Sequence, residues 1–102
     1  AFGDAADAFR RALAVDPSMG PARHNLGVAL VRAGRLDEAI VALREAVRLE
    51  PDSEGAIYTL GVALLAAGDR QGVATCVRQL EALGTAEGSA LAKRLAGSAG
   101  AP

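Results

Sequence analysis

The sequence repeats itself with an offset of 34 residues. The segment LGVAL at 26–30 recurs unchanged at 60–64, and the same offset carries Gly34 onto Gly68. Applied backwards, it carries Ala5, Ala12 and Pro17 onto Ala39, Ala46 and Pro51, with Phe9 falling on Leu43. A unit of this length is typical of a helical hairpin, because two helices of three to four turns and their connections fill it. The repeat therefore predicts an all-α fold.

Residues that start and stop helices recur within the unit. Pro21 stands where a first-turn proline is tolerated, and Gly34 follows the apolar run where a left-handed C-cap residue is favoured. Asp37 and Glu38 open the next helix at its positive dipole end. Six helices and no strand are predicted, over residues 2–15, 20–33, 36–49, 54–67, 70–83 and 86–96.

The first helix of each unit is apolar on two sides, whereas the second is apolar on one. In 20–33, Leu26 and Leu30 lie on one stripe and Val28 and Val31 on another, and 54–67 follows the same plan. One stripe packs inside the hairpin. Because stacked hairpins wind into a superhelix whose inner wall is built from the first helices, we expect the other stripe to line a concave groove.

These positions resemble the tetratricopeptide repeat family. The family pattern has Leu-Gly, a large residue three positions later, a turn glycine, two spaced alanines around a bulky residue, and a closing proline. It is met by Leu26, Gly27, Leu30, Gly34, Ala39, Leu43, Ala46 and Pro51, and again by Leu60, Gly61, Leu64 and Gly68. The second unit then departs from it, with Val73, Val77, Leu80 and Thr85 in the last four places. Atypical terminal units are expected in repeat proteins.

The resemblance implies a right-handed superhelix of stacked helix-turn-helix hairpins over residues 1–97. We divide it into a half repeat at 2–19, a repeat at 20–53, a degenerate repeat at 54–85 and a capping helix at 86–96, with a tail at 98–102. It also implies a non-catalytic module that recognises a protein partner through the groove. The groove residues expected from the second stripe are His24, Asn25, Val28, Val31, Arg32, Tyr58, Thr59, Val62 and Leu65.

Two functions remain open. In the first, the groove binds an apolar or amphipathic segment of a partner protein. A clamp for carboxylates is disfavoured, because Arg32 is the only cation we expect near the wall, although Asn25 matches one clamp position. In the second, the units are the architectural end of a longer superhelix attached to an enzymatic or secretory domain, and the groove is filled by self-association.

Residues 2–15 match only the second helix of a unit. We therefore expect the missing first helix to lie upstream in a longer protein or to come from another copy of the chain. The face that carries Phe9 and Leu13 would then be partly uncovered, and exposed apolar patches favour association. A homodimer through this helix or through the groove is the resulting prediction.

Composition argues against several other functions. With 11 basic and 12 acidic side chains, a net charge of -1 provides no basic surface for nucleic acid. Cys76 and His24 are each single, so we expect neither a disulfide nor a zinc site. Asp37 and Glu38 diverge on one helix turn, and the glycine-rich stretches lack the Gly-Lys-Ser/Thr of a phosphate loop. No catalytic residue, metal or cofactor is predicted, and the apolar stretch 56–68 is too short for membrane insertion.

Overall fold

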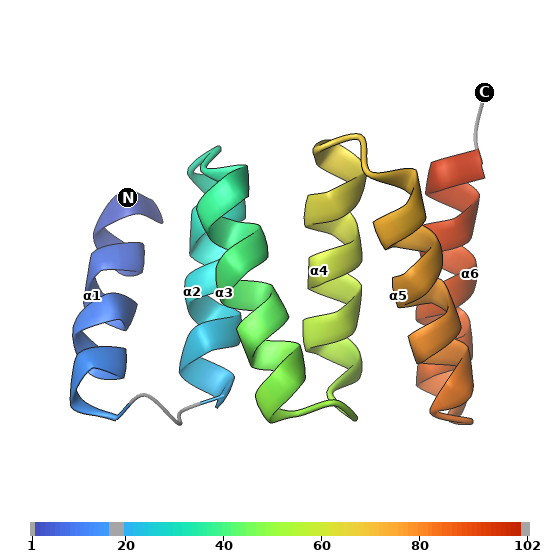
Figure 1. Ribbon diagram of the computed structural model, residues 1–102, viewed down its shortest axis with the longest axis horizontal. Coiled ribbons are helices and arrows are strands. Elements are labelled where there is room, and N and C mark those ends of the chain that lie inside the picture. The colour runs from blue at the N-terminus through green and yellow to red at the C-terminus, as the bar shows by residue number, and fades with distance from the viewer. Residues whose placement is uncertain (1, 17–19, 101–102) are drawn as a thin grey trace.

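A computed structural model describes residues 2–16 and 20–100, and within these residues it consists of six helices joined by turns, with no strand. Each helix lies where the sequence predicts one, which confirms the all-α fold. The helices are α1 (Phe2–Val15), α2 (Gly20–Arg32), α3 (Leu36–Leu49), α4 (Glu54–Ala66), α5 (Arg70–Ala82) and α6 (Ala86–Gly100) (Figure 1).

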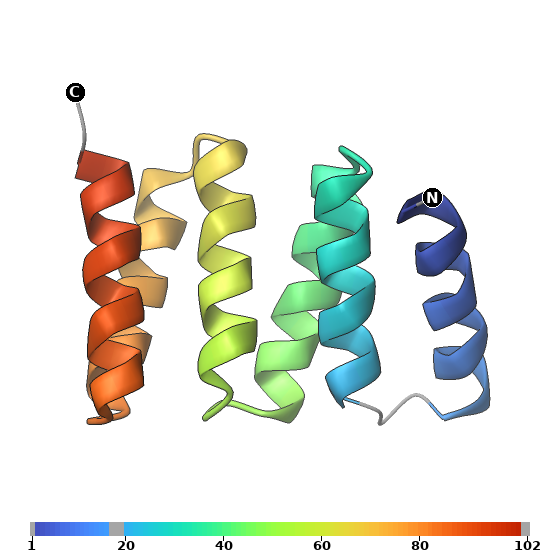
Figure 2. The ribbon, with the colours of Figure 1, turned by 180° about the vertical axis from the view of Figure 1, so that it is seen from behind.

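The helices stack as hairpins in two layers. Consecutive helices contact each other, and α4 also contacts both α2 and α6. The layer of α2, α4 and α6 is nearer the viewer in Figure 2, and α3 and α5 are nearer the viewer in Figure 1. The first helices of successive hairpins therefore lie side by side, which is the arrangement of a helical repeat protein.

The two hairpin turns share one geometry. Gly34 and Gly68 adopt φ angles of 79° and 80°, a left-handed conformation that costs glycine least. In each turn the glycine N–H donates to the carbonyl three residues earlier, and the next residue donates to the carbonyl five residues earlier, at 2.9 to 3.1 Å. This pair of hydrogen bonds is a Schellman motif, which ends α2 and α4 and reverses the chain.

The core is aliphatic, and two glycines let helices approach closely within it. A Cβ atom at Gly27 would lie 2.4 Å from Leu43 Cγ, and one at Gly61 would lie 2.3 Å from Leu95 Cδ2, so no side chain fits at either position without displacing its neighbour. The repeat positions around these glycines expose 6% or less of their surface: Leu26, Leu30, Ala39, Leu43, Ala46, Leu60 and Leu64.

The last helix is longer than the sequence indicated. It continues to Gly100 instead of ending at residue 96, so most of the tail expected at 98–102 is helical. Leu95 is buried, and Ala99 packs against the core one turn later. The Ser98 hydroxyl donates to the Arg94 carbonyl at 3.1 Å, which satisfies this side chain within the helix. Residues 101 and 102 lie outside the described part of the chain.

The apolar face of α1, which carries Phe9 and Leu13, is covered in part. Leu13 is 8% exposed and belongs to the core, because α2 packs along α1 and covers it. Phe9 is half-buried against the same core, whereas Val15 is 88% exposed. Leu13 is therefore covered, and the part of this face that stays open lies at Phe9. The predicted turn residue Pro17 lies outside the described residues.

Candidate protein-binding groove

Six of the nine predicted groove residues line one hollow of about 260 Å³ between α2 and α4. We call this hollow the groove. Because α2 and α4 contact each other side by side, their outward stripes meet on the layer that also holds α6 (Figure 2). The residues that line it are Val28, Val31 and Arg32 from α2 and Tyr58, Thr59 and Val62 from α4.

The apolar side chains of the groove are not sealed inside the protein. Val28, Val31, Tyr58 and Val62 are all half-buried, whereas Leu30, on the opposite stripe of α2, is 1% exposed. Both helices thus bury one stripe in the core and present the other at the surface. Apolar surface that stays partly exposed in a hollow is available for contact with another molecule.

His24 acts as a link between α2 and α4. Its Nε2 atom lies 3.0 Å from Thr59 Oγ1, and the Thr59 hydroxyl donates its own proton to the Gly55 carbonyl at 2.8 Å. Thr59 must therefore accept a hydrogen bond from Nε2–H of His24. Burial lowers the pKa of His24 from 6.5, and the nearby charge of Glu50 opposes this shift. His24 is consequently neutral near pH 7 and held in place.

The other two predicted groove residues lie outside the hollow. Asn25 is exposed and does not line it. Leu65 is half-buried and packs against the core one turn beyond Val62. Neither forms a wall of the hollow.

Sequence reasoning missed Arg94 on α6. Its guanidinium carbon lies 6.0 Å from the centroid of the Tyr58 ring, a cation–π distance. The signal was an offset of 32 residues instead of 34: the buried residues Gly88, Ala92 and Leu95 follow Ala56, Leu60 and Ala63 by 32. On this offset α6 is equivalent to the first helix of a repeat, and Arg94 occupies the position that Val62 holds in α4.

Cys76 has the surroundings of a packing residue. It is 1% exposed among the core residues of α5, and burial raises the pKa of its thiol. The thiol therefore stays protonated near pH 7, and a protonated thiol is a weak nucleophile. This agrees with the sequence interpretation of Cys76 as a small apolar residue.

Among the described residues, none of the helices is long and apolar enough to cross a membrane. Two family models, both described as Tetratricopeptide repeat, match residues 2–54 and 30–95. Comparison with curated proteins gave no match. Each family match covers more than half of the 102 residues, and together they span the hairpins, the Schellman turns and α6 up to residue 95. The chain therefore belongs to the tetratricopeptide repeat family.

Proposed function

We propose that the groove between α2 and α4 binds a short apolar or amphipathic segment of a partner protein. Tetratricopeptide repeats generally mediate protein–protein interaction and are typically non-catalytic. The observation that carries the proposal is the meeting of Val28, Val31 and Val62 in one open hollow beside Tyr58. Three half-buried valines in contact with water form a surface that gains free energy when a partner covers it.

The size of the groove suggests how much of the partner it holds. Its volume of about 260 Å³ lies below the roughly 300–1,000 Å³ of pockets that enclose a whole small molecule. It suits one or two anchoring side chains, each worth about 1.5–3 kcal/mol on full burial. With weaker contacts around such an anchor, we expect a dissociation constant in the micromolar range, which corresponds to a binding free energy of about -8 kcal/mol.

Charge at the groove favours a neutral or acidic partner. Arg94 covers the Tyr58 ring beside the hollow, and no carboxylate is among the residues that line it. A basic segment would be repelled, whereas acidic residues next to the apolar anchor would be attracted. We therefore expect a partner segment with a large apolar residue flanked by Asp or Glu.

The test replaces Val28 and Val62 together. Peptides are first selected on the wild-type chain from a random display library, and their affinities are measured by calorimetry. Val28→Asp with Val62→Asp is expected to weaken binding at least thirtyfold, because a carboxylate would have to be buried in the apolar contact. Both valines are half-buried, so helicity and melting temperature should change little.

The matched control is Val41→Asp. Val41 is 70% exposed on α3, in the other layer of the fold, so the same substitution there should leave peptide binding unchanged. Loss of folding in the double variant would show that the stripe belongs to the core. Equal binding by the double variant and the wild-type chain would place the binding surface elsewhere. Either result contradicts the proposal.

A second candidate function is the architectural one, and one observation favours it. A second apolar hollow, of about 460 Å³, lies between α5 and α6, with Val73, Val77, Ala96 and Ala99 among its lining residues. A further helix, from the same protein or from a second copy, would cover this surface as α6 covers α4. If this surface forms the interface, Val77→Asp should abolish any species heavier than one chain in light scattering. If self-association instead fills the groove between α2 and α4, the Val28 and Val62 variant should abolish it. A homodimer through α1 or through the groove stays a prediction.

A further inference from the structure

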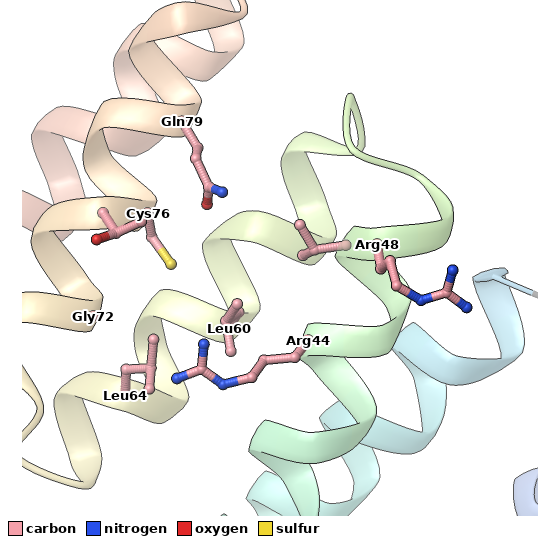
Figure 3. A pocket seen from close by; sticks show the side chains of 9 residues that line it. Arg44, Arg48, Leu60, Leu64, Gly72, Cys76 and Gln79 are labelled. Carbon is pink, nitrogen blue, oxygen red and sulfur yellow. The ribbon is translucent and has the colours of Figure 1, made fainter.

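Two crevices on the α3–α5 side of the molecule are related by the 34-residue repeat. The first lies between α1, α2 and α3, and the second, of about 300 Å³, lies between α3, α4 and α5 (Figure 3). Positions 10, 26, 30, 38, 41 and 42 of the first correspond to positions 44, 60, 64, 72, 75 and 76 of the second. The repeat thus allows the two crevices to be compared residue by residue.

In the first crevice an arginine is neutralised by a carboxylate. Arg10 Nη2 on α1 lies 2.6 Å from Glu38 Oε1 on α3. Glu38 also accepts a hydrogen bond from Arg35 at 2.6 Å. These hydrogen bonds, that from Arg35 first, lower the pKa of Glu38 and keep its carboxylate charged. Arg10 therefore has an ionised partner that belongs to the same chain.

In the second crevice the arginine remains but its carboxylate is absent. Arg44 corresponds to Arg10, and Gly72 stands where Glu38 would be. Within the described residues Arg44 makes no hydrogen bond and no ion pair shorter than 4 Å. Its side chain reaches across the crevice towards α4 and α5, whereas Arg48 turns away and pairs with Glu45 (Figure 3).

The missing carboxylate cannot come from position 72 itself. A Cβ atom at Gly72 would lie 2.8 Å from Asp69 Oδ2 and 2.9 Å from Leu64 Cδ1. Asp69 is already engaged, because its other oxygen accepts from the Gly72 N–H at 2.9 Å and caps α5. A side chain at this position would disturb the cap. The second crevice therefore stays open, and the Arg44 guanidinium has no carboxylate partner from position 72.

We propose that the second crevice binds the side-chain carboxylate of a glutamate from a partner protein, in the place that Glu38 holds in the first. Arg44 supplies the charged donor, and Gln79, whose side chain points into the crevice in Figure 3, supplies an amide donor. Leu60 and Leu64 form an apolar floor for the methylene groups of the ligand. This site is separate from the groove, since it opens on the layer of α3 and α5.

The experiment uses a blocked glutamate, with acetyl and methylamide groups on its ends, so that its side-chain carboxylate is the only charge. Titration into the isotopically labelled chain, followed by nuclear magnetic resonance, should shift signals of Leu60, Leu64 and Gln79. Blocked glutamine, which has nearly the same shape without the charge, should bind at least tenfold more weakly. Arg44→Gln should weaken the binding of glutamate by a similar factor.

Two further variants act as controls. Arg11→Gln removes an exposed arginine on α1 that lies in neither crevice, and it should leave the titration unchanged. Glu38→Ala removes the internal carboxylate of the first crevice, so a second set of shifts should appear near Leu26 and Leu30. Equal binding of glutamate and glutamine, equal binding by wild type and Arg44→Gln, or no new site in Glu38→Ala would each overturn the proposal.

Discussion

The first repeat, α2 and α3, is closed by its own residues, whereas the second, α4 and α5, is completed by the helix that follows it. Leu43 of α3 fills the space beside Gly27, and both belong to the same hairpin. Beside Gly61 the space is filled by Leu95 of α6, and Val77, the counterpart of Leu43, is half-buried beside α6. The turns of the two repeats are nevertheless the same.

This difference shows that a repeat can keep its backbone geometry while the source of its core residue changes. In the second repeat Leu95 from α6, and not Val77, lies in the space beside the glycine. The last helix therefore does more than shield an end of the array. It supplies a core side chain to α4 and a cation to the Tyr58 ring.

A large side chain at each glycine should have the largest effect and should distinguish the two repeats. Gly27→Leu should lower the free energy of unfolding by about 3 kcal/mol, because the new Cβ meets Leu43 Cγ, a branch atom in a residue with 0% exposure. Gly61→Leu should cost less, about 1–2 kcal/mol, because it meets a terminal methyl of Leu95 on the outermost helix, which can move away. Urea unfolding followed by circular dichroism measures both values.

Gly97→Leu is the control for these variants, since nothing lies within 4 Å of a Cβ at Gly97. We expect it to be neutral or to stabilise the chain by up to about 1 kcal/mol through helix propensity. Equal losses at Gly27 and Gly61 would show that α6 is as firmly held as α3, and the proposed difference between the two repeats would be wrong.

A smaller effect tests what the repeats share. Gly34→Ala and Gly68→Ala should each cost about 1 kcal/mol, because alanine is strained at the φ of 79° and 80° in these turns. Nothing lies within 4 Å of a Cβ at either position, so the cost comes from the backbone alone and should be the same in both. Thermal melts of the two variants measured side by side check this. A difference of more than about 0.5 kcal/mol would contradict the equivalence of the turns.

The smallest effect concerns the link between the repeats, His24 to Thr59. Burial lowers the pKa of His24 below 6.5 in the folded chain. Its contribution to stability is therefore complete above pH 6.5 and falls as the pH drops through this value, because the unfolded chain takes up the proton first. Unfolding measured at about pH 7.5 and about pH 5.5 should show a larger loss for wild type than for His24→Gln, which does not titrate. The same loss in both chains would sink this prediction.

The sequence was a reliable guide to the helices, and six of the nine residues expected in the groove line one hollow. The 34-residue offset predicts both hairpins, and the two-sided apolar pattern predicts the six residues that meet in the hollow. The 34-residue offset does not extend to α6, where the offset is 32 residues. The repeat pattern therefore does not predict the position of Arg94. The sequence also does not show which part of the α1 face is covered, because the burial of Leu13 depends on how closely α1 and α2 pack.

The sequence pattern alone sets where each helix begins, where each hairpin turns and which stripes are apolar, because these features depend on contacts within a few residues. Packing between helices, in contrast, places Leu95 in the space at Gly61, brings Arg94 over Tyr58 and leaves Arg44 without a carboxylate. These depend on the distances between helices far apart in the chain. Such distances follow from the packing of all side chains together, which a local pattern does not contain.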